Sequence, residues 1–145
     1  MKVVAENRRA RFDYGVLEKF EAGIELSGQE VKSAKLGRMN LSSSYAVIKN
    51  GGAWLLNAEI PAYQPKNAPA DYKSDRTRRL LLHKHELKSL TGRLQEKGLS
   101  LIPFKAYLKK NLVKIELGLA RSRKKHDKRE LIRRRAAERE MRRLE

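Results

Sequence analysis

Residues 102–119 read IPFKAYLKKNLVKIELGL, which is the pattern of a long β-hairpin. Apolar side chains occupy every second position over residues 102–108 and again over residues 113–119. A period of two places alternate side chains on one face of a strand, so each run predicts a strand with one buried face. Lys109-Lys110-Asn111 separates the runs and predicts the turn. The hairpin therefore indicates an antiparallel sheet.

Most of the sequence before this hairpin also has strand character. Further strands are expected in segments that are apolar or alternate with period two, namely residues 20–26, 45–49, 53–60 and 79–83. Asn50-Gly51-Gly52 lies between the second and third of these and is a strong hairpin signal. Short helices are expected at residues 29–36 and 84–97, each followed by a glycine suited to a helix C-terminus. Residues 61–75 carry three prolines and predict an irregular, mobile surface loop.

About six strands and two or three short helices around one core predict a mainly β fold. The best match is a small, OB-like antiparallel β-barrel that is closed or partly open. The strands follow one another too closely for regular βαβ units, whose crossover connections are long, so we do not expect a parallel sheet. The apolar alternation ends at Leu119-Ala120, where a charged run begins. We therefore divide the chain into a barrel, residues 1–120, and a basic tail, residues 121–145.

The tail holds 12 Lys or Arg against 5 Asp or Glu, and it contains no Gly, Pro or aromatic residue. As a helix it would be cationic on nearly every side and would have no apolar face to lay on its own domain. We expect it to be disordered in isolation and helical when a polyanion, most commonly RNA, encloses it.

Composition narrows the classes of function. The net charge is +17, of which +10 lies on residues 1–120, so a polyanion should touch both parts of the chain. The absence of cysteine excludes disulfides, thiolate zinc sites and cysteine nucleophiles. The sequence has no apolar run of about 18 residues and no signal-peptide pattern at its start, so we expect a cytoplasmic protein that binds no membrane. No catalytic motif stands out, His83 and His85 should face opposite ways, and we expect no metal and no cofactor.

Basic clusters mark the candidate nucleic-acid contacts. They occur at residues 7–11, 28–40, 76–79 and in the tail. Each has an ordinary alternative: a charged edge, a helix that caps the barrel, a guard on an edge strand, or a solvated tail. The chain has few aromatic residues, which favours folded RNA recognised through shape and backbone over single strands stacked on an aromatic platform.

Seven blocks in order resemble the SmpB family, the tmRNA-binding proteins of bacterial trans-translation: residues 7–14, 20–24, 28–33, 40–41 with 44–46, 78–84, 113–121 and 127–129. The resemblance implies a noncatalytic OB-like barrel, expected to be monomeric, that grips the tRNA-like domain of tmRNA in place of an anticodon arm. It also implies delivery by elongation factor Tu to ribosomes stalled on truncated messages. There the tail would fold as a helix in the empty mRNA channel and decoding region.

The clusters and the resemblance together assign two sets of residues. Those expected to bind tmRNA, or to support its binding face, are Asn7, Arg8, Arg11, Glu21, Glu30, Lys32, Ser33, Lys35, Arg38, Arg78, Leu81 and Lys114. Those expected to place the tail at the decoding centre are Arg121, Lys124, Lys125, His126, Asp127, Lys128 and Arg129. Two departures from the family pattern are Ser122, expected to stiffen a hinge, and Met39, expected to remove a phosphate contact.

Rival hypotheses remain open on the sequence alone. A general basic ribosome-associated or RNA-chaperone OB protein would bind RNA without preferring a tRNA-like elbow. An RNA-modifying enzyme would need a cofactor or an acid–base pair. A membrane-surface or protein-interaction module would depend on the tail alone.

Overall fold

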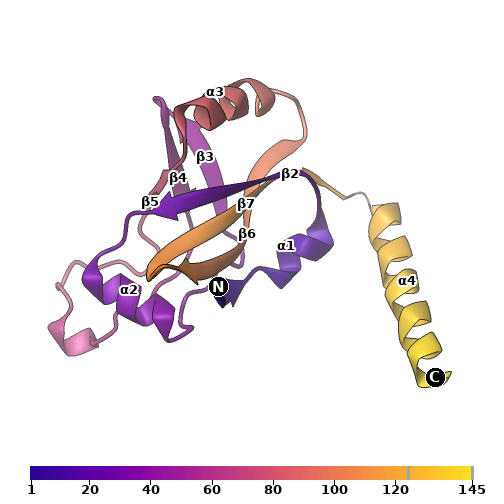
Figure 1. The fold of residues 1–145 in the computed structure, drawn as a ribbon, viewed down its shortest axis with the longest axis horizontal. Coiled ribbons are helices and arrows are strands. Elements are labelled where there is room, and N and C mark those ends of the chain that lie inside the picture. Colours follow the sequence, from indigo (N-terminus) through magenta and orange to yellow (C-terminus); the bar gives the residue numbers. More distant parts are fainter. Residues whose placement is uncertain (124, 145) are drawn as a thin grey trace.

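The computed structural model describes residues 1–123 and 125–144, with the side chains of residues 125–127 and 144 outside the description. Seven strands and four α-helices occur in this part of the chain (Figure 1). The strands are β1 (Lys2–Glu6), β2 (Tyr14–Ile24), β3 (Tyr45–Lys49), β4 (Gly52–Leu56), β5 (Arg78–Leu81), β6 (Leu99–Lys109) and β7 (Leu112–Ser122). The helices are α1 (Arg8–Asp13), α2 (Gly28–Lys35), α3 (Lys84–Arg93) and α4 (Lys125–Leu144), with a short 3-10 turn at Pro65–Asn67.

The strand pairings form a ring. The order is β1-β6-β3-β4-β5-β2-β7, and β7 pairs again with β6, so six antiparallel strands surround the core and β1 extends one edge. The ring is loosest between β3 and β6, where Ala46 opposite Leu101 is the one residue pair found among the described residues. The architecture confirms the predicted OB-like antiparallel sheet, as a ring that is partly open at this joint.

The predicted long hairpin is present and forms the longest strand pair of the ring. β6 and β7 pair from Leu99 opposite Arg121 to Lys109 opposite Leu112. Lys110 and Asn111 form the turn with φ of 51° and 64°, the two positive values that a tight hairpin turn of matching twist requires. The hairpin predicted around Asn50-Gly51 is also confirmed, with φ of 53° and 74° at these two residues.

The core fills the inside of the ring. Its side chains come from the alternating positions of the strands and include Leu55, Leu80, Leu101, Ile115 and Leu117, all nearly fully buried. Met39, expected at the RNA surface, belongs to this core, so its apolar side chain has a packing role. The interpretation of Met39 as a lost phosphate contact is therefore wrong.

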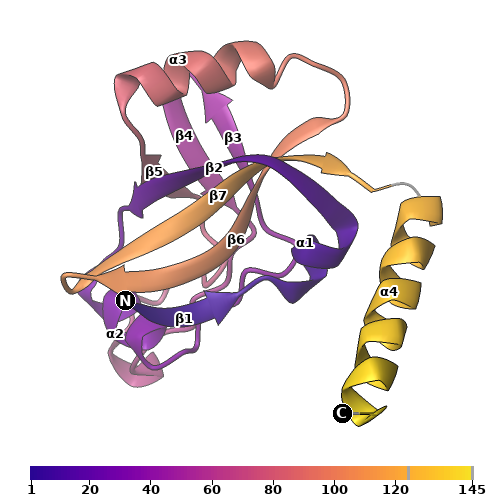
Figure 2. The ribbon, with the colours of Figure 1, turned by 45° about the vertical axis from the view of Figure 1, so that its right-hand side comes forward.

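Helix α1 was not anticipated, because its six residues are too few to show a helical period. It begins after β1 and packs outside the ring, where Ala10 joins Ile102, Phe104 and Ala120 in a second small cluster. Helix α1 lies near the end of β6 and β7 that is away from the turn between them (Figure 2).

Two further expectations need correction. The loop of residues 61–75 is irregular, but it is anchored, since the Tyr72 hydroxyl donates to the Ile60 carbonyl at 2.5 Å and the Ile60 N–H donates to the Ser74 carbonyl at 2.9 Å. His83 and His85 do not face opposite ways. His83 lies at the N-terminal cap of α3, which turns the chain, and the two rings stack at 5.6 Å between centroids.

The basic tail forms α4, which stands apart from the ring, with its contacts to the rest of the described chain concentrated at α1 (Figure 1). β7 continues to Ser122, which pairs with Tyr14 and is the last residue of the sheet; the expected stiffening of a hinge at this position stays a prediction. Helical structure was expected of the tail in an enclosing polyanion; its disorder in isolation stays a prediction.

Candidate nucleic-acid interface

The open end of the outer face of β5, β2, β7 and β6 brings together three residues that the sequence singled out. The strand register places Leu81 opposite Gly23, Gly23 opposite Lys114, and Lys114 opposite Tyr107. Residues of β5 alternate between the two faces, so Arg78 and Leu80 are buried while Leu81 is 48 % exposed. Gly23 has no side chain, and the Leu81 side chain packs over it, since a Cβ at Gly23 would lie 3.4 Å from the Leu81 Cβ.

Glu21 lies next to this row and is held in place. Its carboxylate accepts hydrogen bonds from the Tyr107 hydroxyl and from Lys109 Nζ, the latter at 3.2 Å. The Tyr107 hydrogen bond is the main reason that the pKa of Glu21 lies below its ordinary value, and Lys109 and Lys114 lower that pKa further. Burial and the bond to Glu21 raise the pKa of Tyr107, so its hydroxyl stays a donor at neutral pH. Glu21 thus presents a fixed anion that can accept from ribose or base donors.

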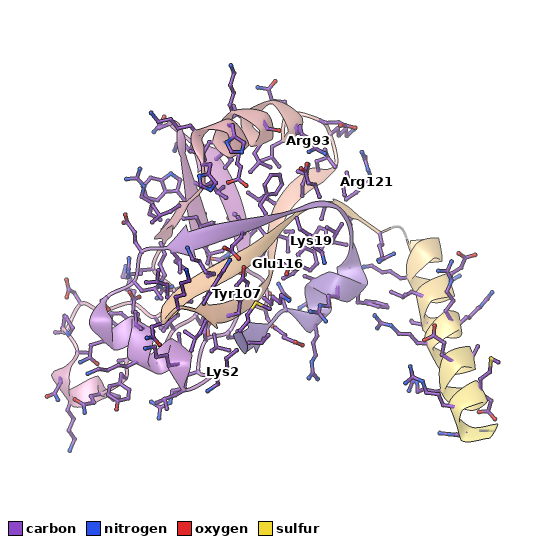
Figure 3. The ribbon with its side chains drawn as sticks, viewed as in Figure 1. Lys2, Lys19, Arg93, Tyr107, Glu116 and Arg121 are labelled. Carbon is purple, nitrogen blue, oxygen red and sulfur yellow. The ribbon has the colours of Figure 1, made fainter. Side chains whose placement is uncertain are left out.

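Lysines of neighbouring strands also contact the carboxylate of Glu116, which lies beside Glu21. Lys19 Nζ lies 3.7 Å and Lys105 Nζ 3.3 Å from the two oxygens of Glu116, the outward residue opposite Glu21. Lys105 also lies 5.8 Å from the centre of the Tyr107 ring. Figure 3 shows Lys19, Glu116 and Tyr107 following one another across the face. We call this surface the lysine face; its members are Lys19, Glu21, Gly23, Leu81, Lys105, Tyr107, Lys109, Lys114 and Glu116.

Helix α2 carries a second group of cations. Ser27 caps its N-terminus, where the Ser27 hydroxyl accepts from the Glu30 N–H and the Glu30 carboxylate accepts from the Ser27 N–H. Lys32 on the outward side lies 5.6 Å from the centre of the Tyr63 ring. Arg38 follows the helix and donates to the Tyr63 carbonyl at 3.5 Å.

Glu30 itself faces inward and ties three segments together. It is 1 % exposed and accepts from Arg76 Nε at 3.0 Å and from Arg78 Nε at 2.8 Å. Arg78 in turn donates to the carbonyls of Ala58 and Ser74 at 2.8 and 2.9 Å. Burial alone would raise the pKa of Glu30, but the hydrogen bonds from Arg76, the Ser27 N–H and Arg78 outweigh it and lower this pKa to about 2.

Burial therefore separates the predicted site residues into two kinds. Asn7, Glu30, Ser33 and Arg78 are buried, so in this structure they are not exposed for direct contact with RNA, and their predicted part in binding stays a prediction of support. The Asn7 amide donates to the carbonyls of Leu41 and Pro103 at 3.1 and 2.9 Å, and its oxygen caps α1. The sequence could not reveal this, because a polar residue among arginines has the pattern of an exposed one.

The remaining predicted residues are distributed over several surfaces. Arg8 and Arg11 are exposed on α1, Lys35 lies on α2, and Arg121, also exposed, donates to Glu96 at 3.0 Å. Lys128 and Arg129 lie in the first turns of α4. Lys124 lies outside the described residues, as do the side chains of Lys125, His126 and Asp127.

Sequence reasoning missed Lys19, Lys105, Tyr107 and Lys109. A signal was present, since these residues occupy the outward positions of the same alternation that predicted the strands. No helix in the described part of the chain is long and apolar enough to cross a bilayer. Nor does that part contain a group of three or more His, Asp or Glu arranged to hold a metal ion.

A family model described as SmpB protein matches residues 4–145. The chain belongs to the SmpB family. The SsrA-binding protein of Gloeothece citriformis is 49 % identical over 98 % of this chain and 92 % of its own length. The SsrA-binding protein of Carboxydothermus hydrogenoformans is 51 % identical over 97 % and 93 %.

A solved structure described as "tmRNA-SmpB: a journey to the center of the bacterial ribosome" contains a chain with the same fold. It is 44 % identical, covers 89 % of this chain and 94 % of its own, and superposes with a TM-score of 0.69. Membership of the SmpB family thus agrees with the resemblance carried by the seven sequence blocks.

Proposed function

We propose that the chain is a noncatalytic RNA-binding protein of the bacterial cytoplasm that binds the tRNA-like domain of tmRNA and brings it to stalled ribosomes for trans-translation. The observation that carries the proposal is the lysine face, found in a chain whose relatives are named for binding SsrA RNA. It joins Glu21, Leu81 and Lys114 on one open surface.

Each part of the lysine face suits folded RNA. Lys19, Lys105, Lys109 and Lys114 can neutralise phosphates, which supplies most of the affinity but little selectivity. Leu81 beside Gly23 offers an apolar contact where the backbone lies close to the surface. Glu21 adds an acceptor for ribose hydroxyls or base amino groups. A surface that presents only sulfate or lipid phosphate groups has no such donors for it.

The buried network around Glu30 supports this function at a second place. It fixes α2 against the loop that follows β4 and against β5, so that Lys32, Lys35 and Arg38 project from one rigid helix end. A fixed arrangement of cations matches the spacing of phosphates in a structured RNA at a lower entropic cost than a flexible one.

The tail supplies the ribosomal part of the proposal. α4 carries arginines on all sides and stands away from the ring, so it can enter a channel lined by RNA, such as the empty mRNA channel, while the lysine face holds tmRNA. Elongation factor Tu would act through the charged tmRNA, and the protein would act as a monomer.

The decisive experiment is recovery and sequencing of the RNA bound to the protein in cells. One dominant tRNA-like species is expected; a broad RNA population would favour a general RNA chaperone instead. Binding in vitro should show the same preference for the tRNA-like domain over a duplex of equal length.

Substitutions on the lysine face test which residues carry the binding. E21A should weaken tmRNA binding by about 1–3 kcal/mol, since a direct hydrogen bond to a charged group is lost. K114A should weaken binding and reduce the salt slope by about 1. Glu59→Ala and Lys88→Ala, exposed residues outside this face, are the matched controls. Unchanged affinity in E21A and K114A at fixed salt would remove the lysine face from the interface.

A further inference from the structure

The first turn of α4 docks on the end of α1. We propose that Asp13, the last residue of α1, is the positioning residue that sets the direction of the tail relative to the barrel, with Lys128 as its partner. The consequence for ribosome rescue rests on the proposed function, but the docking itself does not.

Two contacts join the two helices at this point, and a third joins α1 to the segment just before α4. Lys128 Nζ lies 3.0 Å from Asp13 Oδ1, and both side chains are about one third exposed, at 32 % and 28 %. The same ammonium group lies 5.8 Å from the centre of the Phe12 ring. The Arg123 N–H donates to the Asp13 carbonyl at 2.7 Å, so both the side chain and the backbone of Asp13 face the base of the tail.

The connection between sheet and tail is short. The last residue pair of β2 and β7 is Tyr14 opposite Ser122, and α4 begins at Lys125. Three Cα–Cα steps separate Ser122 from Lys125 and span at most about 11 Å, so the start of α4 cannot move far from the end of the sheet. The sheet therefore fixes where the tail starts, and the docking at Asp13 decides the direction in which it leaves (Figure 2).

Asp13 does little for α1 itself. A carboxylate at the C-terminal end of a helix meets the negative end of the helix dipole, which is unfavourable. Its contact with Arg9 at 3.6 Å has the base four residues before the acid, the less favourable order for such a pair. The partner that explains an acid at this position is Lys128.

The docking is of a strength that can be tested and reversed. The partly exposed ion pair and the cation–π contact together raise the ratio of docked to undocked tails roughly 3- to 30-fold. Asp13 thus presents the tail in one main direction while the barrel is held on RNA. Farther along α4, this contact adds nothing to helix stability.

The test measures the direction of the tail by double electron–electron resonance. The chain has no cysteine, so spin labels can be placed by Ser89→Cys on α3 and, close to the docked first turn of α4, by Glu130→Cys, both exposed. With Asp13 and Lys128 intact, one narrow distance distribution is expected. D13N and K128Q should each lower the ratio of docked to undocked molecules by up to roughly 5-fold and broaden the distribution, and the charge exchange D13K/K128D should restore the narrow distribution.

The controls separate docking from folding and from RNA binding. Arg129→Gln removes the same charge from the neighbouring residue and should leave the distribution unchanged, and affinity for tmRNA should stay within about twofold in all variants. Tagging on stalled ribosomes should fall in D13N and K128Q and recover in the exchange. Distances unchanged in D13N, an exchange no better than the single variants, or a loss of tmRNA affinity in D13N would overturn the proposal. A protein that shows no preference for tmRNA would refute the proposed function and leave the distance result standing.

Discussion

Glu30 shows how one residue can serve binding without touching the ligand. Its carboxylate is buried between Arg76 and Arg78, and these three residues connect α2, the loop before β5 and β5 itself. A buried pair gains little net stability, but removing one partner leaves the other charge without compensation. We therefore expect Glu30 to control the placement of the α2 cations through the fold.

E30Q should lower the free energy of unfolding by about 3–5 kcal/mol at pH 7, because Arg78 stays buried and charged. The effect should depend on pH with a definite sign. The pKa of Glu30 falls from 4.5 in its ordinary state to about 2 in the fold, so its contribution is complete above pH 4.5 and is lost as the pH falls towards 2. Urea unfolding of E30Q and of the exposed control Glu59→Gln from pH 7 to pH 2 checks this. A constant difference between wild type and E30Q over that range would contradict it.

Gly118 is a second residue with a sharp requirement. A Cβ at this position would lie 2.5 Å from Cε2 of Phe104, which is itself buried under α1. Gly118→Ala should therefore cost about 1–3 kcal/mol through overpacking. Thermal unfolding tests this against Gly28→Ala, where a Cβ would meet no atom within 4 Å. Equal stability of the two variants would show that α1 yields easily.

At this scale the sequence predicted the exposed site residues better than the buried ones. The structure brings the exposed Glu21, Leu81 and Lys114 together on one surface, and their contact with RNA stays a prediction. Glu30 and Arg78 were taken for surface residues, because they become a buried pair only when segments 48 residues apart meet. Charge in a sequence does not show which cations have a buried partner.

At the scale of elements, long periodic segments were predicted well and short ones were not. The hairpin of β6 and β7 has 11 residues in each strand and a clear alternation. α1 has six residues and depends on the cap supplied by Asn7, whose amide is held by carbonyls 34 and 96 residues away. Such a helix forms through tertiary contacts that no local pattern contains.

The tail helix should be stable only near its docked end in the free protein. Like charges repel along α4, and pairs such as Glu138 with Arg142 add only about 0.2–0.5 kcal/mol each. Hydrogen exchange should therefore show protection that falls from the first turn of α4 to its end, and RNA that encloses the tail should raise it. Uniform strong protection in the free protein would show that the helix needs no partner.

At the scale of the whole molecule, charge and topology act together. The chain has a net charge of +17. Its ring of strands carries the lysine face on the outer surface, and the basic tail follows the last strand. The sequence predicted the ring, since antiparallel hairpins around one core have few ways to close. It could not predict the looser joint between β3 and β6, because that joint depends on how far the sheet twists and not on any one segment.

Binding to tmRNA should depend steeply on salt. If 6–10 phosphates are neutralised, affinity should fall roughly 10³–10⁵-fold between 50 and 200 mM monovalent salt. Titrations of the full chain and of a variant ending at Arg123 check this, and the truncated variant should keep most of its affinity while losing activity on stalled ribosomes. If truncation abolished both together, barrel and tail would not divide the work as proposed.

The position of β1 affects the tendency of the molecule to associate with other copies of itself. β6 meets β3 at one residue pair among the described residues, and β1 occupies the remaining length of that side, from Lys2 opposite Leu108 to Glu6 opposite Lys105. A bare strand side is a template on which foreign strands grow. β1 is a strand of five residues with a register irregularity between Val3 and Ala5, and a short, irregular edge strand resists such pairing. A chain cut before Asn7 should expose the side of the longer strand β6 instead and should self-associate more readily.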